Sequence, residues 1–161
     1  MSGIAEAWTL LRGRGAEGVP RPGAPTDFGP AFALPRTPNA ALAAPPGHPL
    51  PATLRHPPVP LSPERAFEAL RAVAAAMPRT APLAEWPERL QAQWVARTAL
   101  VGFPDVVVGQ VEAVPGAAGS AVILYSRSLL GHSDLGENAR RLRRWLAALD
   151  EAAGRGGGGG G

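Results

Sequence analysis

The sequence predicts an α+β fold: a small two-layer sandwich in which an antiparallel meander sheet carries two helices on one face, preceded by a Pro-rich extended segment. Amphipathic patterns after residue 60 run in the order helix, strands, helix, and glycine or proline turns separate the strands. Of the 19 prolines in the 161 residues, 13 lie in the first 60. We therefore expect a Pro/Gly-rich, largely irregular segment over residues 1–60, a single domain over 61–153 and a disordered glycine tail over 154–161.

The N-terminal segment shows almost no periodic apolar pattern from residue 13 to residue 60. Its prolines lack the backbone N–H and bias their neighbours to extended conformations, so we expect a polyproline-like strap, part free and part laid on the domain. An extended stretch around residues 52–59 is placed to pair with a sheet edge, where proline is tolerated.

The domain is expected to begin with a helix at Ser62-Pro63-Glu64, because serine caps a helix, proline fits its first turn and an early glutamate favours its dipole. Pro78 ends this helix. One apolar stripe runs along it, formed by Phe67, Leu70, Ala74 and Met77.

Four extended segments follow, a short one around residues 81–85 and three longer ones at 89–98, 106–114 and 121–128. The second alternates, with Leu90, Ala92, Trp94 and Ala96 on one side and Gln91, Gln93 and Arg97 on the other, which is typical of a half-buried antiparallel strand. A last helix is predicted over 135–152, where Asp134 and Glu137 have capping-box spacing. Its apolar face consists of Leu135, Ala139, Leu142, Leu146 and Leu149.

The segment from Ser126 to Arg141 joins the last strand to this helix and concentrates polar residues in a tight turn. Helical geometry places Asn138 about 60° from the centre of the apolar stripe, nearer the core than any arginine. A partly buried amide without partners costs ~1–3 kcal/mol, so Asn138 must bond to the turn backbone or to a ligand. Arg127, at the end of a strand, and Arg97 are candidate neighbours.

The run S-R-S-x-x-G-x-S-D-x-G-x-N-x-x-R resembles the signature of the bacterial and plastid family called domain of unknown function 1499. It is carried here by Ser126, Arg127, Ser128, Gly131, Ser133, Asp134, Gly136, Asn138 and Arg141. Residues 97–105, ending on Asp105, resemble that family's second block, and residues 38–47 resemble a linker seen before its domain. The resemblance covers about residues 38–149 and implies the fold without implying a chemistry, because the family's activity is not established. Many members carry an N-terminal membrane helix or a lipoprotein signal, and neither pattern is visible here.

Composition excludes several kinds of site. Without cysteine there are no disulfides, thiolate zinc sites, iron–sulfur clusters or cysteine nucleophiles. The 16 basic residues are all arginine, and acidic residues balance those of the domain, so nucleic acid is not an expected partner despite a pI of about 10.9. We expect no membrane span and a cytoplasmic protein, or a membrane-associated or envelope protein if the true start lies upstream.

Catalytic, metal and cofactor sites are not assigned. Gly131-x-Ser133 follows a strand as in a nucleophile elbow, but the second glycine, Gly136, comes one residue too late. His132, Ser133 and Asp134 are consecutive, so their side chains diverge and cannot form a triad among themselves. The three histidines show no metal-ligand spacing.

Three hypotheses remain open. In the first, Arg97, Arg127 and Arg141 converge with Ser128, Ser133 and Asn138 on an anionic group of a small molecule, lipid or protein partner, in a non-enzymatic binding or assembly module. In the second, an enzyme of unrecognised type uses Asp105 or Asp134 with Arg127.

In the third, the motif is structural: Asp134 caps the helix, Arg127 pairs with Asp105 or Asp134, and Gly131 and Gly136 permit the turn. Three arginines lining one open cleft would favour binding. An Arg127–Asp134 pair sealed under the helix would favour the structural hypothesis.

Overall fold

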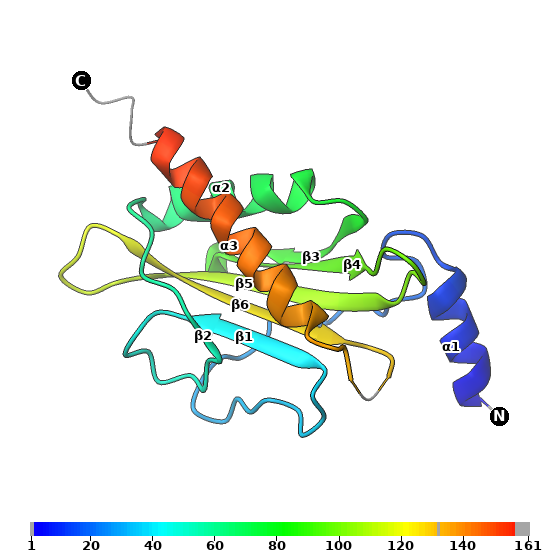
Figure 1. Cartoon of the computed structure of the whole chain (residues 1–161). Coiled ribbons are helices and arrows are strands. Elements are labelled where there is room, and N and C mark those ends of the chain that lie inside the picture. The colour runs from blue at the N-terminus through cyan, green and yellow to red at the C-terminus, as the bar shows by residue number, and fades with distance from the viewer. Residues whose placement is uncertain (1, 132, 157–161) are drawn as a thin grey trace.

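The computed structural model describes residues 2–131 and 133–156 and shows one sheet with three helices (Figure 1). In chain order the elements are α1 (Ser2–Arg12), β1 (Ala40–Ala44), β2 (Leu54–Arg55), α2 (Pro63–Ala76), β3 (Thr80–Trp86), the 3₁₀ turn η1 (Pro87–Arg89), β4 (Gln91–Arg97), β5 (Pro104–Ala113), β6 (Ser120–Ser128) and α3 (Glu137–Gly156). The predicted α+β class is therefore confirmed.

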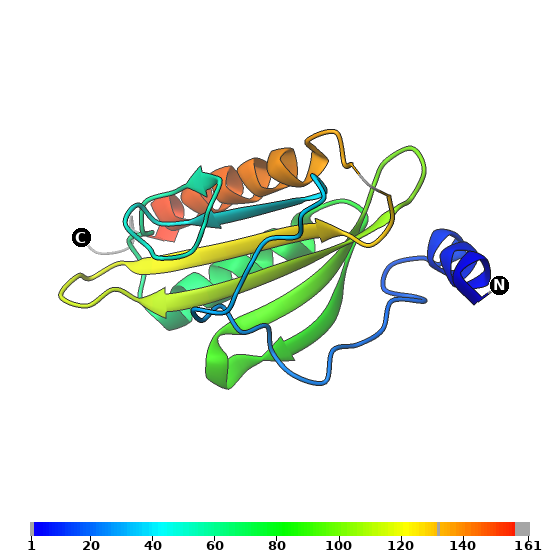
Figure 2. The same ribbon diagram turned by 90° about the horizontal axis from the view of Figure 1, so that it is seen from below.

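The sheet has six strands in the order β2-β1-β6-β5-β4-β3. All neighbouring strands are antiparallel except β1 and β2, which pair in parallel, so the sheet is mixed rather than wholly antiparallel. Helices α2 and α3 lie together on one face of the sheet (Figure 2). Their core includes Trp94 of β4 and Trp145 of α3, whose ring centroids are 5.3 Å apart.

The starts of α2 and α3 are set by the residues that precede each helix. Before α2, the Ser62 hydroxyl accepts a hydrogen bond from the Arg65 N–H, and the helix ends before Pro78. The last helix begins at Glu137 rather than at residue 135, because Leu135 (φ 52°) and Gly136 (φ 82°) have left-handed backbones. Leu135 is consequently 85% exposed, and its prediction as part of the buried helix face is wrong.

The strap packs against the second face of the sheet, where Val19, Phe28 and Phe32 form a separate core with side chains such as Ile123 and Tyr125. This covering explains why β4 is buried on both faces and is not the half-buried strand that its alternation predicts. The polar side chains of Gln91 and Gln93 are satisfied there by hydrogen bonds with Thr26 of the strap.

The strap also supplies two strands from the segment expected to be largely irregular. β1 lies beside β6 with Ala41 opposite Ser126, and β2 falls within the stretch predicted to pair with a sheet edge. At the other end of the chain, α3 continues to Gly156, so residues 154–156 of the expected tail are helical. Residues 157–161 lie outside the described residues. No helix in the described part of the chain is long and apolar enough to span a bilayer.

Candidate functional site

The turn between β6 and α3, residues 129–136, and the loop between β4 and β5, residues 98–103, lie at the same end of the sheet (Figures 1 and 2). Part of the predicted motif lines the space between them, namely Ser128, Gly131, Ser133 and Asp134. Two regions can be distinguished there: a buried polar network under α3, and an open cleft above it.

The turn is shaped by Asp134, whose carboxylate accepts hydrogen bonds from the N–H groups of Gly136 (2.8 Å) and Asn138 (3.0 Å). These bonds satisfy N–H groups that the first turn of a helix leaves without partners. Gly131 adopts a left-handed backbone (φ 89°), and its carbonyl accepts from the Asn39 side chain (3.0 Å). The predicted capping role of Asp134 thus has a geometric basis.

Asn138 is the centre of the buried network and is fully buried. The two N–H donors of its amide have three acceptors within hydrogen-bond distance: the Asn39 carbonyl (3.0 Å), the Ser128 hydroxyl (2.9 Å) and the Asp134 carboxylate (2.7 Å). Its amide oxygen accepts from the Ser126 hydroxyl and from the Arg141 guanidinium. One side chain therefore ties together the residue preceding β1, the end of β6 and the start of α3.

Arg141 forms a buried ion pair with Asp105 of β5, at 2.7 Å between Nη1 and Oδ2. The exposed fractions of the two side chains are only 4% and 2%. Burial raises the pKa of the Asp105 carboxyl, although the charge and hydrogen bond of Arg141 and a hydrogen bond from Ser128 act in the opposite direction. The Arg141 guanidinium is thus committed to partners inside the protein.

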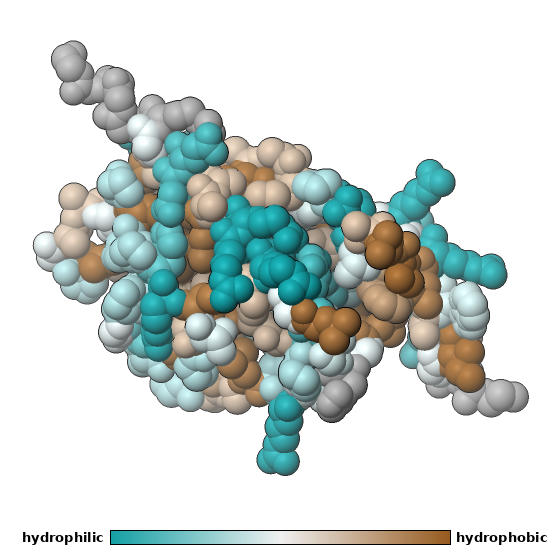
Figure 3. All heavy atoms as spheres, viewed as in Figure 1, coloured by the Kyte–Doolittle hydropathy of each residue, from teal (hydrophilic) through white to brown (hydrophobic). Residues whose placement is uncertain are grey.

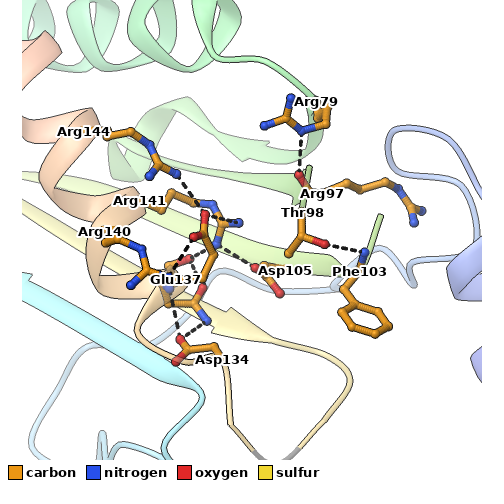
Figure 4. A network of polar contacts seen from close by, with 12 residues as sticks. Arg79, Arg97, Thr98, Phe103, Asp105, Asp134, Glu137, Arg140, Arg141 and Arg144 are labelled. Atoms are coloured by element: carbon orange, nitrogen blue, oxygen red, sulfur yellow. Dashed lines mark hydrogen bonds and ion pairs between the residues drawn. The ribbon is translucent and has the colours of Figure 1, made fainter. Parts of the chain in front are cut away.

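A cleft of about 580 Å³ lies next to this network, between the 98–103 loop and the 129–136 turn. Its lining combines three guanidiniums, three carboxylates and exposed apolar side chains. The guanidiniums belong to Arg79, Arg140 and Arg144, and Figure 4 shows Arg140 and Arg144 beside Glu137 on α3, with Arg79 apart from them. Loop residues Leu100, Val101 and Phe103, with Leu135 of the turn, supply the apolar part.

Glu137 links the cleft to the network. Its carboxylate contacts Arg144 (3.0 Å) and Arg140 (3.3 Å), both 54% exposed, and lies 3.9 Å from buried Arg141. Burial opposes ionisation of Glu137, but the hydrogen bond and charge of Arg144, with further contributions from Arg141 and Arg140, lower its pKa. Because Arg141 neutralises Asp105, the other two carboxylates of the lining face three arginines, and the cleft keeps a net positive charge.

The structure brings most of the predicted residues together. Asp105, Ser128, Asn138 and Arg141 belong to the buried network, while Ser128 also lines the cleft. Ser133 lines the cleft too, and its hydroxyl accepts from the Leu135 N–H (3.3 Å). His132 lies outside the described residues.

Arg97 and Arg127 do not join them. The Arg97 guanidinium turns to α1 and the strap, where it donates to the carbonyls of Leu10 (2.6 Å), Gly15 (2.9 Å) and Glu17 (3.0 Å). Figure 4 shows its side chain pointing away from Arg141. Arg127 is exposed on the strap side of β6, and neither of the ion pairs expected for it, with Asp105 or Asp134, is formed. The expected convergence of Arg97, Arg127 and Arg141 is therefore wrong. Strand alternation directs Arg97 and Arg127 to the strap side of the sheet, whereas Arg141 lies under α3 on the other side.

The three cleft arginines were not predicted as site residues. Arg140 and Arg144 are four residues apart on one side of α3, a spacing that sequence can reveal. Arg79 follows the proline that ends α2 and has a left-handed backbone (φ 53°), so no periodic pattern marks it. Among the described residues, no three histidine or acidic side chains gather closely enough to hold a metal ion.

Comparison with known proteins gives a family and a fold. The family model described as "Protein of unknown function (DUF1499)" matches residues 33–149. A search of curated proteins finds no matching relative. The structure resembles protein MLL2253 from Mesorhizobium loti, with a TM-score of 0.50 and 11% identity over 72% of this chain and 97% of that chain. An uncharacterised protein from Rhizobium leguminosarum matches with a TM-score of 0.47 and 12% identity over 72% of this chain and 94% of that chain.

Proposed function

Because this chain belongs to the DUF1499 family, whose description states no activity, we propose a function from the geometry of its site. The protein is a non-enzymatic binding module whose cleft holds a ligand with an anionic group and an apolar part. The observation that carries the proposal is the lining of the cleft, in which Arg79, Arg140 and Arg144 lie together with exposed apolar side chains of the 98–103 loop.

The chemistry of the lining favours this ligand class. A guanidinium presents a planar set of donors that matches a carboxylate or phosphate, and arginine pairs with such groups strongly. Arg140 and Arg144 share one carboxylate, Glu137, so their remaining donors can turn to a ligand. A volume of about 580 Å³ also falls within the usual range for small-molecule sites. Ser128 and Ser133, at the cleft wall, are further candidate contacts.

Binding is favoured over catalysis by the state of the carboxylates. Asp105 is buried in an ion pair with Arg141, and Asp134 accepts bonds from the start of α3. The enzyme hypothesis combined one of these groups with Arg127, which lies on the opposite face of the sheet. Each carboxylate thus has a structural partner that catalysis would have to remove.

Calorimetric titration with hexyl phosphate, inorganic phosphate and hexanol tests the proposal. We expect hexyl phosphate to bind more tightly than either of its halves, because only it meets both parts of the lining. The double variant Arg79→Ala/Arg144→Ala should weaken hexyl phosphate binding by about tenfold or more, as expected for loss of charged hydrogen bonds. Arg143→Ala is the matched control, because Arg143 is an exposed arginine of α3 that does not line the cleft. Equal binding by the double variant and the control would refute the proposal.

A further inference from the structure

The exposed large apolar side chains of the described chain are gathered at one end of the molecule. They are Ile4 and Trp8 on α1, Leu100, Val101 and Phe103 on the β4–β5 loop, and Leu135 on the β6–α3 turn. Leu100 is 98% exposed and Leu135 is 85% exposed. Figure 3 shows brown side chains at this end, over α1 and beside the start of α3, and both ribbon views place the three elements there.

These three apolar protrusions lie next to one another. Arg97 donates to the carbonyl of Leu10 in α1 and to that of Gly102 in the β4–β5 loop (3.0 Å), so it joins the first two protrusions. The loop and the turn that carries Leu135 line the same cleft, so the second and third protrusions lie next to each other. The end of the molecule therefore presents one surface, which we call the tip surface.

Arginines lie among the apolar side chains of the tip surface. Arg12, in the last turn of α1, lies over the ring of Trp8 at 5.5 Å from its centroid. Arg79, Arg140 and Arg144 surround the cleft between the other two protrusions. Apolar side chains, a tryptophan and arginines on one surface are the combination that enters the interface of an anionic bilayer.

We propose that the tip surface binds the surface of an anionic phospholipid bilayer, with its apolar side chains inserted and its cleft arginines on headgroup phosphates. This inference rests on the proposed function, because the cleft supplies the phosphate contacts. A bilayer fits better than a protein partner, since the apolar side chains project separately and charged groups lie between them. An 11-residue helix alone holds weakly to a membrane, but here two further protrusions insert beside it.

Co-sedimentation with vesicles is the test. We expect the protein to sediment with vesicles of equal parts phosphatidylcholine and phosphatidylglycerol, and far less with phosphatidylcholine alone. Leu100→Glu/Val101→Glu should lower the affinity for the anionic vesicles by about tenfold or more, because two charged side chains resist insertion. The matched control is Ala117→Glu/Ala118→Glu, which adds the same charge to exposed positions of the β5–β6 hairpin, at the other end of the sheet.

The outcomes separate the two proposals. Binding of hexyl phosphate without binding of anionic vesicles would overturn the bilayer inference and leave the proposed function standing. Failure of both ligands would overturn both. The bilayer inference would also be overturned if the tip and control variants lost vesicle binding equally. It would likewise be overturned if the protein did not bind vesicles but formed a dimer in sedimentation velocity that only the tip variant disrupted. Thermal melts of both variants check that each remains folded.

Discussion

Three of the four arginines between residues 140 and 144 of α3 lie in two different environments. Arg141 is 4% exposed and pairs with buried Asp105, whereas Arg140 and Arg144 are 54% exposed and share Glu137 at the cleft rim. The first pair has little contact with water, so losing one partner would leave a charge with poor solvation. The second set is hydrated and screened, so its contacts add little to stability. One short motif therefore separates into a part that holds the fold together and a part available to a ligand.

The largest effect on stability is expected from Arg141→Ala, which leaves the Asp105 carboxyl buried without its ion pair. The free energy of unfolding should fall by about 3–5 kcal/mol, measured by urea denaturation. The double variant Asp105→Leu/Arg141→Met should recover much of this loss, because no buried charge then remains. A loss as small as that of Arg140→Ala would contradict the distinction between the two environments.

Asn138→Ala should come next, with a loss of about 2–3 kcal/mol, since it removes the group that joins Asn39, just before β1, to β6 and α3. At roughly 2–4 °C per kcal/mol for a chain of this size, the thermal midpoint should fall clearly. Arg127→Ala is the matched control from the same motif and should change stability by less than about 0.5 kcal/mol. Equal melting points for the two variants would contradict the prediction that buried residues of the motif stabilise the fold and exposed ones do not.

An intermediate effect is expected from Arg97→Ala, because Arg97 is buried but its hydrogen-bond acceptors in α1, the strap and the β4–β5 loop are neutral backbone carbonyls, so the variant leaves no unpaired charge. The loss should be about 1.5 kcal/mol and local. Limited proteolysis should cut the chain near residues 10–20 before the sheet unfolds. Global unfolding without early cleavage would instead make the strap part of a single cooperative unit with the sheet.

Glu137→Gln should have the smallest effect, about 0.5–1 kcal/mol, and it should depend on pH. The pKa of Glu137 is lowered in the folded protein, so its contribution is full above the ordinary value of 4.5 and is lost as pH falls through the lowered pKa. Asp105 has the opposite pH dependence, because the stability that comes from its raised pKa is lost as pH rises. Its contribution is the same in the unmodified protein and in Glu137→Gln, so it cancels in the difference between their free energies of unfolding. Urea denaturation of both proteins, from above pH 4.5 down through the lowered pKa of Glu137, measures this difference. A difference in the free energy of unfolding that grows as pH falls would refute the prediction.

The fold was predictable where the pattern is local. The α2 stripe and the β4–β6 segments could be recognised from periodicity because each buries a defined set of its own side chains. β1 could not, because its sequence is Ala-Ala-Leu-Ala-Ala between prolines and its strand character comes from β6, which lies more than 70 residues later. Burial of Gln91 and Gln93 likewise depends on the distant strap.

The site was predictable in part for the same reason. Helical geometry correctly placed Asn138 toward the core, but it missed Arg141, which is buried beside it. Alternation along β6 already groups Ser126 and Ser128 with Val122 and Leu124, on the face toward α3, and so puts Arg127 on the other face. The cleft depends on how a loop and a turn are arranged in space, and no periodic pattern in the sequence reveals that arrangement.

The hydrogen bond from Asn138 to the Asn39 carbonyl joins residues 99 positions apart. During synthesis, β1 emerges well before β6, its partner in the sheet, and before Asn138 of α3, which binds the carbonyl of the residue preceding β1. At roughly 5–20 residues per second, the ribosome leaves β1 unpaired with β6 for several seconds. Prolines around this strand then discourage pairing with other chains while it waits. The composition that obscures β1 in the sequence also protects the nascent protein until its last helix is made.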